Sequence, residues 1–181
     1  SSAPLTYTGV IKGIKPVEAN IIDTFKTING YSTTTNSVSA EYKTAVTQGR
    51  RAYVGNIKQD ADGDGSAEFY EDRMLRSQVN KFDTFPSELG VVDVAIRDGE
   101  SIVKLESFND RILQFKERTL YVINVSDAVE FLEDTFQFRG IGFPYHAVKT
   151  DIGVAFFNKF GCFIYDGKSI VDLLERQRRK T

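Results

Sequence analysis

The chain has 181 residues, 41% of them hydrophobic and 27% charged, which is enough apolar content to bury the core of one domain. A net charge of −2 argues against nucleic acid as the main partner, and a single cysteine excludes a disulfide within the chain. No segment approaches the roughly 18 apolar residues of a membrane span, and the first residues are not those of a signal peptide.

Residues 1–41 carry the weakest pattern. Tyr7 to Ile14 alternates well enough to predict a strand. Asn20 to Ile28 has apolar residues at helical spacing, which favours a short helix over a second strand. Asn29-Gly30 ends that segment, and the Ser-, Thr- and Asn-rich stretch after it predicts an exposed loop.

A β-hairpin is predicted next. Tyr42 to Thr47 and Arg51 to Ile57 are rich in β-branched and aromatic residues and flank a tight turn at Gln48-Gly49. In such a hairpin Ala45-Val46 lies opposite Tyr53-Val54.

The segment that follows has the spacing of a calcium-binding loop. Oxygen-bearing side chains stand at the ligand positions of a twelve-residue loop that starts at residue 60, and a glycine stands at its sharp turn. The candidate metal ligands are Asp60, Asp62, Asp64, Ser66, Glu68 and Glu71. The flanking residues predict strands rather than the two helices of an EF-hand, so a bound Ca²⁺ would stiffen a hairpin turn. The alternative is a soluble, mobile turn without metal.

From Glu100 to Leu174 the chain repeats one pattern twice. A shift of 153 − 111 = 42 positions superimposes two predicted hairpins. It pairs Leu113 with Ala155, Phe115 with Phe157, Leu120 with Cys162, Tyr121 with Phe163 and Val122 with Ile164. The hairpin near Gly49 is a third copy. A recurrence near 40 residues of short β-rich runs is typical of propeller blades, which stack because one meander cannot cover its own apolar face.

We therefore predict an all-β chain of propeller-like antiparallel meanders, forming an incomplete propeller or a fragment, with a short helix near either end. Near the C-terminus, Ile170, Leu173 and Leu174 fit a helical stripe, although a strand running into a tail also fits. The predicted organisation is an N-terminal extension or partial blade over 1–41, blade-like repeats over 42–174 and a basic tail over 175–181.

No residue stands out as catalytic. His146 is the one histidine and has no nucleophile motif to serve, so we expect it to be packed or on the surface. Cys162 lies in an apolar run and is expected to be a small buried hydrophobe. Thr135 to Phe138 predicts a strand, and Gly140 to Pro144 predicts a loop. We predict that the protein is not an enzyme.

Several ordered motifs resemble those of the propeller-type virion structural proteins of tailed bacteriophages, which are nozzle or hub components of the tail. The motifs are Arg51–Asn56, Asp72–Ser77, Asn80–Pro86, Asp98–Ile102, Phe115–Tyr121 and Tyr165–Gly167. The resemblance implies a structural role in a tail ring or channel wall. It also implies assembly in the host cytoplasm, and partners that are other virion proteins and copies of the chain itself.

Three units cannot close a ring, since propellers have at least four blades. The end units would then leave strand edges and apolar faces open. The chain starts with serine rather than methionine, so our first expectation is a piece of a longer virion protein, and symmetric assembly of copies is the second. Arg176, Arg178, Arg179 and Lys180 could touch DNA that passes through a channel, although such a cluster is usually a solvated end.

Two other classes of function fit parts of the sequence. One is a calcium-stabilised adhesion or ligand-binding propeller, which would use the loop at 60–71. The other is a glycan-processing propeller enzyme, which would need carboxylates converging at the ring centre. Asp110, Asp151 and Asp166 are better explained as turn formers.

Overall fold

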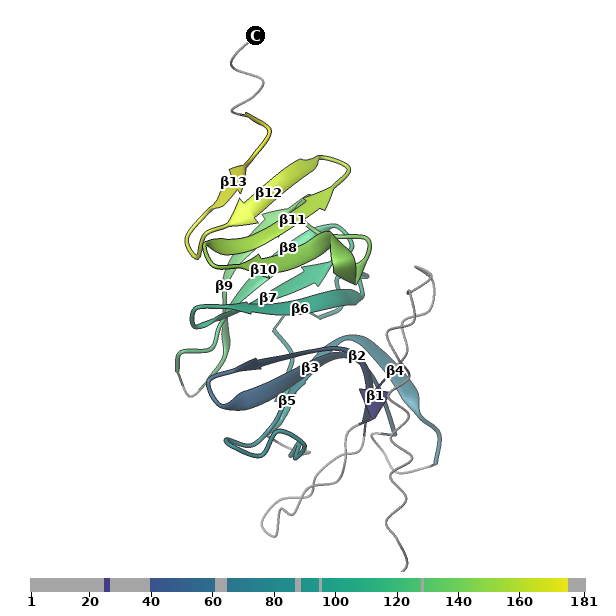
Figure 1. The fold of residues 1–181 in the computed structure, drawn as a ribbon. Coiled ribbons are helices and arrows are strands. Elements are labelled where there is room, and N and C mark those ends of the chain that lie inside the picture. The colour runs from purple at the N-terminus through teal and green to yellow at the C-terminus, as the bar shows by residue number, and fades with distance from the viewer. Residues whose placement is uncertain are drawn as a thin grey trace, which may run out of the picture.

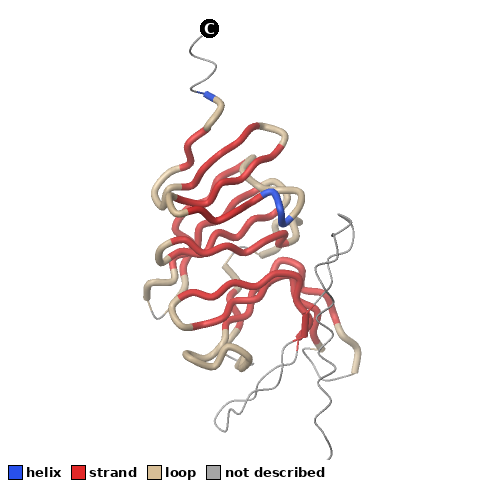
Figure 2. The backbone as a smooth tube through the Cα atoms, in the orientation of Figure 1, coloured by secondary structure: helices blue, strands red, loops and turns tan. Residues whose placement is uncertain are grey.

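The computed structural model describes residues 25–26, 40–60, 65–86, 89–94, 96–127 and 129–175. Within these residues the chain forms three antiparallel β-sheets and one short 3₁₀ helix, η1 (Pro144–His146). None of the sheets closes into a barrel, and strands dominate the backbone trace (Figure 2). The prediction of an all-β fold built from blade-like meanders is confirmed.

The first sheet contains five strands in sequence order. They are β1 (Phe25–Lys26), β2 (Ala40–Gln48), β3 (Arg51–Gln59), β4 (Glu68–Arg76) and β5 (Val91–Val92). The predicted hairpin is confirmed, because Ala45 pairs with Val54 and Val46 with Tyr53. Its turn is Gly49-Arg50, one residue later than predicted, and both residues have positive φ (57° and 60°), as a two-residue turn of this hand requires.

The other two sheets have four strands each, again in sequence order. The middle sheet is β6 (Ile102–Phe108), β7 (Arg111–Lys116), β8 (Thr119–Asn124) and β9 (Phe131–Gln137). The last sheet is β10 (Ala147–Thr150), β11 (Gly153–Asn158), β12 (Gly161–Tyr165) and β13 (Ile170–Asp172).

The predicted repeat holds at the level of strand register. Leu113 pairs with Val122 in the middle sheet, and Ala155 pairs with Ile164 in the last sheet. Phe115 pairs with Leu120, and Phe157 pairs with Cys162. Each residue of these pairs in the middle sheet lies 42 positions before its equivalent in the last sheet. The two sheets are therefore copies of one meander.

The three sheets are stacked face to face, with the middle sheet between the other two (Figure 1). The first strand of the middle sheet, β6, contacts β2 of the first sheet and β10 of the last sheet. One core, between the first and middle sheets, includes Tyr53, Met74, Ile102, Leu105, Ile112 and Ile123. A second, between the middle and last sheets, includes Leu113, Phe115, Leu120, Val122, Val154, Phe156, Phe163 and Tyr165. The middle sheet is therefore apolar on both faces, because each face has a neighbour.

The far side of the first sheet has a cover of its own. Phe85, which is 2% exposed, packs with Val54 and Leu75 in a third core cluster. Phe85 belongs to the connection between β4 and β5, so the chain folds this segment back over the sheet. Alternation of side chains across β3 and β4 places these residues on the face opposite Tyr53 and Met74.

The predicted N-terminal helix is wrong where the structure describes it, and at the C-terminus the strand alternative holds over Ile170–Asp172. Phe25 and Lys26 form β1, which pairs with Tyr42 and Glu41, because the edge of β2 offers backbone groups that need partners. The rest of the 20–28 segment lies outside the described residues. Ile170–Asp172 is strand β13, in which Ile170 packs on the second core, and the basic residues of the tail again lie outside the described part.

Candidate functional site

The predicted calcium loop connects two strands, as expected from its flanks. β3 ends at Gln59 and β4 begins at Glu68, and these two residues pair. At the start of the loop, the Asp60 carboxylate (Oδ2) accepts a hydrogen bond from the Gly65 backbone N–H at 2.9 Å. Asp62 and Asp64 lie outside the described residues.

The remaining loop residues point to different partners. Ser66 is exposed, and the Glu68 carboxylate accepts a hydrogen bond from the Tyr70 hydroxyl at 2.7 Å. Glu71 lies further along β4 and lines a shallow hollow. Among the described residues no group of three or more metal-ligating side chains gathers, so calcium binding stays a prediction that depends on Asp62 and Asp64.

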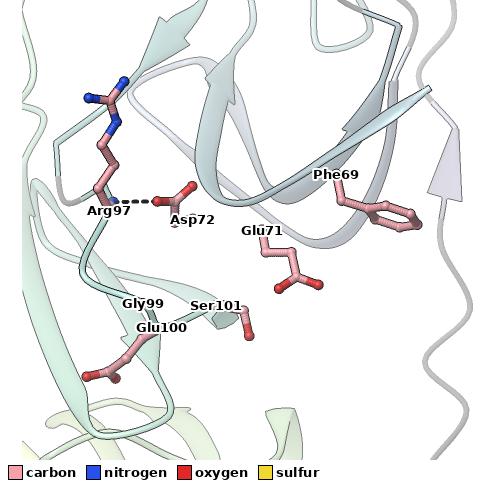
Figure 3. Close-up of a pocket in the computed structure, with 7 residues that line it drawn as sticks. All are labelled: Phe69, Glu71, Asp72, Arg97, Gly99, Glu100 and Ser101. Carbon is pink, nitrogen blue, oxygen red and sulfur yellow. Dashed lines mark hydrogen bonds between the residues drawn. The ribbon is translucent and has the colours of Figure 1, made fainter. Parts of the chain in front are cut away.

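The hollow has a volume of about 550 Å³ and opens between β4 and the segment before β6 (Figure 3). Its lining residues are Phe69, Glu71, Asp72, Arg97, Gly99, Glu100 and Ser101. Asp72 accepts a hydrogen bond from the Arg97 backbone N–H at 2.6 Å. Glu100 accepts from the Arg118 N–H at 2.7 Å and the Thr119 N–H at 3.2 Å. These two carboxylates therefore hold neighbouring loops in place.

An ion pair between the buried Lys116 side chain and the partly exposed Asp98 carboxylate, which we call the Asp98 network, joins the same segment to the middle sheet. The Lys116 side chain is fully buried, and its ammonium donates to Asp98 Oδ1 at 2.7 Å. The Tyr121 hydroxyl donates to Asp98 Oδ2 at 2.8 Å. Burial acts to raise the pKa of Asp98, but the hydrogen bonds from Lys116 and Tyr121 outweigh it and the pKa is lowered. Burial and the Asp98 carboxylate raise the pKa of Tyr121 to about 12.

The Asp98 network brings together two motifs that the sequence shows apart, Asp98–Ile102 and Phe115–Tyr121. Lys116 and Asp98 are 18 residues apart in the chain, and no local pattern connects residues at that separation. Sequence reasoning therefore found both motifs but not their contact.

A second polar network, the Glu130 network, links the first sheet to the connection between β8 and β9. Glu130 accepts a hydrogen bond from the Tyr53 hydroxyl at 3.0 Å and forms a salt bridge with Arg76. Burial acts to raise the pKa of Glu130, but the Arg76 and Tyr53 hydrogen bonds lower it overall. For Tyr53, burial and the nearby Glu130 charge raise the pKa.

We expect Glu130→Gln to reduce the free energy of unfolding by about 2 kcal/mol at pH 7, because hydrogen bonds to a charged group are lost. The folded-state pKa of Glu130 is lowered, so its contribution is present above the unfolded-state pKa and disappears as the pH falls through the folded-state pKa. The difference between wild type and variant should therefore narrow below about pH 4. Urea unfolding from pH 7 to pH 3 measures it.

Glu133→Gln is the matched control for that prediction. Glu133 pairs with Arg111, and both side chains remain about a quarter exposed (24% for Arg111 and 30% for Glu133). Solvent screens such a pair, so we expect a loss of less than about 1 kcal/mol. If the wild type stays more stable than Glu130→Gln by the same free energy of unfolding down to pH 3, the Glu130 carboxylate does not make the charged hydrogen bonds described above.

Neither His146 nor Cys162 has a partner for nucleophilic catalysis among the described residues. The His146 ring packs on Phe157, with ring centroids 4.4 Å apart, and its Nδ1 is buried without a hydrogen bond. Cys162 is partly exposed rather than buried as predicted, because it lies on the outward face of the last sheet, on which no other sheet of the described chain packs.

This face, which we call the open face, consists of Val148, Ala155, Phe157, Cys162, Ile164 and Val171. Strand pairing places Val148, Ala155, Ile164 and Val171 in one row across all four strands, with the Phe157–Cys162 pair beside it. The alternate residues of these strands point the opposite way. Phe156 and Phe163, for example, pack against the middle sheet and are only 1% exposed. Val148 is 58% exposed and Phe157 47%.

The repeat identifies what is unusual about the open face. Its four central residues, Ala155, Phe157, Cys162 and Ile164, are equivalent to Leu113, Phe115, Leu120 and Val122 of the middle sheet. Those four are fully buried beneath the last sheet. Equivalent positions are thus covered in one sheet and open in the next, as the prediction of uncovered end units requires.

Within the described residues no helix is long and apolar enough to span a membrane. No model of a known protein family matches the chain, and no curated protein sequence matches it significantly.

Proposed function

We propose that the chain is a non-enzymatic structural component of a tailed-phage particle and forms part of a tail nozzle or hub ring, or of a channel wall. The observation that carries this proposal is the stack of equivalent blade-like sheets that ends in the open face. The ordered motifs that resemble propeller-type virion proteins support it independently.

The physical reason is that, within the described residues, no neighbouring sheet packs on the open face. Burying an aliphatic or aromatic side chain stabilises a protein by about 2 kcal/mol, and the open face presents several such side chains to solvent. Monomeric soluble proteins seldom leave a continuous apolar patch of this kind, so such a patch marks an interaction surface. Repeat units of this type obtain their stability from lateral neighbours.

On this proposal the chain resides in the virion tail after assembly in the host cytoplasm, with other virion proteins and copies of itself as partners. Polar contacts between the sheets of this chain are examples of how one blade is joined to the next. Lys104 donates to the Ala147 carbonyl at 2.6 Å, and Lys149 donates to the Ser107 hydroxyl at 3.2 Å.

The test is the composition of purified particles of the phage that encodes the chain. We expect quantitative mass spectrometry to find the chain in a fixed, small-integer ratio to other tail proteins, and gold-labelled antibody to mark the tail. Presence of the chain in infected cells but not in particles washed free of lysate would overturn the proposal.

A calcium-stabilised adhesion or ligand-binding module is the second candidate, and one contact favours it. The Asp60–Gly65 hydrogen bond joins the first ligand position of a calcium loop to its turn glycine, which draws the two ends of the turn together. Calorimetric titration of the full chain with Ca²⁺ should then release heat and raise the melting temperature, and Asp60→Asn with Glu71→Gln should abolish both. If the wild type releases no heat, the remaining interpretation of the loop is a soluble, mobile turn without metal.

A further inference from the structure

We propose that residues 77–86, which we call the cap, take the place of a preceding sheet and block the addition of another sheet to the first sheet. This inference rests on the proposed function, which assigns the stack to assembly, and it adds the direction in which sheets are joined. The cap belongs to the connection from β4 to β5 and lies on the side of the first sheet away from the middle sheet (Figure 1).

The repeat shows which residues face a preceding sheet. The first two strands of each meander are joined by a two-residue turn, and the second residue after that turn is Ala52, Ile112 or Val154. Val154 packs on the middle sheet, and Ile112 packs on the first sheet. Ala52 belongs instead to the cluster that contains Phe85 of the cap. The cap therefore stands where the other two sheets have a preceding sheet.

The length of the connection is the second reason. β8 is joined to β9 by residues 125–130, and β12 is joined to β13 by residues 166–169. The corresponding connection in the first sheet, from β4 to β5, covers residues 77–90. The additional residues thus belong to the sheet that has no preceding sheet among the described residues.

Hydrogen bonds fix the cap to the sheet that it covers. Ser77 is fully buried and extends the pairing of β3 with β4. Its backbone N–H donates to the Ala52 carbonyl at 2.8 Å, and its hydroxyl accepts a hydrogen bond from the Ala52 N–H at 2.8 Å. The Asn80 N–H donates to the Arg50 carbonyl at 2.8 Å. Buried polar groups with partners are typical of a segment that is an integral part of the fold.

The two sides of the cap differ in polarity. On the inner side, Phe85 packs with Val54 and Leu75 of the first sheet. On the outer side, Asn80, Lys81 and Asp83 are exposed, together with the ring of Phe82. Stacked repeats need such a terminal unit, because the last apolar face of a stack otherwise meets water or another protein. The open face of the last sheet is then the end that accepts a partner.

The test removes the cap and measures whether the uncovered face associates. The Arg76 N–H donates to the Gly90 carbonyl at 2.7 Å, so the two ends of the connection lie side by side and a short Gly-Ser linker can replace residues 78–89. We expect this shortened chain to self-associate at concentrations roughly 30-fold or more below those that the wild type needs, as measured by sedimentation. Val54→Lys in the shortened chain should reverse this gain, because it places a charge on the uncovered face.

Two further proteins keep the result interpretable. Phe82→Ala removes an apolar side chain of the cap that is 51% exposed, and it should associate as the wild type does, since the sheet stays covered. Circular dichroism should show that the shortened chain folds. If it does not, Phe85→Ala in the intact chain serves instead, because it uncovers Val54 and Leu75 while the hydrogen bonds of Ser77 remain. The same gain and the same reversal by Val54→Lys are then expected.

A folded variant without the cap, or without the Phe85 ring, that associates no more readily than the wild type would overturn the inference. So would a gain that Val54→Lys does not reverse, or an equal gain in Phe82→Ala. These failures are distinct from failure of the proposed function. Unchanged association of the variants, with the chain present in purified tails, would refute the cap alone. A chain absent from particles would refute the virion assignment alone.

Discussion

Phe115→Ala will lower the free energy of unfolding by about 3 to 5 kcal/mol, whereas Phe157→Ala, at the equivalent position of the next sheet, will cost about 1 kcal/mol. Phe115 is fully buried and packs edge-to-face on Phe156, with ring centroids 5.2 Å apart. Its removal leaves a cavity that its neighbours in the core cannot fill. Phe157 is 47% exposed, so its removal leaves little empty volume.

This pair of substitutions is a closely matched comparison. The residue type and the strand position are equivalent, and each phenylalanine pairs with the equivalent residue of the next strand, Leu120 or Cys162, so intrinsic strand propensity cancels. The main difference is the sheet that covers Phe115. Urea unfolding at a protein concentration low enough for the chain to be monomeric measures both values. Equal losses at the two positions would show that the open face is covered, and would remove the main support for the assembly role.

Asp98→Ala will be the most damaging removal of a charge, at about 3 kcal/mol. The Lys116 side chain is fully buried, and the substitution removes the carboxylate that compensates its ammonium group. The Tyr121 hydroxyl loses its acceptor in the same change. We expect the double variant Asp98→Ala with Lys116→Met to be more stable than Asp98→Ala alone, because it no longer buries an ammonium group without its carboxylate.

Asp93→Ala is the control for this prediction. Asp93 makes two hydrogen bonds with Arg73, both at 3.1 Å, yet the two side chains are 27% and 24% exposed. Solvent competes for such a pair, so its loss should cost less than about 1 kcal/mol. Chemical denaturation at pH 7 compares the four proteins. An Asp98→Ala variant as stable as Asp93→Ala would show that the Asp98 carboxylate does not compensate the buried Lys116 ammonium group.

Local sequence predicts the strands of this protein well because each hairpin carries its own signals. The alternation in Tyr42 to Ile57 and the glycine at its turn define both the strands and their pairing. The 42-residue recurrence likewise predicted two equivalent hairpins, and the strand pairs β7–β8 and β11–β12 have equivalent registers. These interactions join residues close in the chain, so short-range patterns contain the information.

The terminal segments show where short patterns fail. Ile170, Leu173 and Leu174 fit a helical stripe, but three residues at the end of a chain do not exclude a strand. The unpaired edge of β12 decided the outcome, because its backbone groups gain partners when Ile170–Asp172 pairs with it. At the other end, Phe25–Lys26 likewise lies in a segment of helical spacing but pairs as β1 with the edge of β2.

The candidate site also combines features that the sequence indicated with contacts that it did not indicate. Sequence indicated that an end unit would expose an apolar face, and it named the loop residues of the calcium pattern. It did not indicate that Phe85 closes the first sheet, nor that Asp98 reaches Lys116. Those contacts depend on how the sheets are stacked, which no local pattern encodes.

By itself, the amino-acid sequence determined that this chain forms antiparallel meanders with a common register, because alternation and turn residues act over a few positions. The tertiary structure alone decided which copies of equivalent residues are buried. Phe115 and Phe157 occupy equivalent positions, and one is core while the other is surface. The physical reason is that burial of a sheet face depends on a neighbouring sheet, and within the described residues only the middle sheet has a neighbouring sheet on both faces.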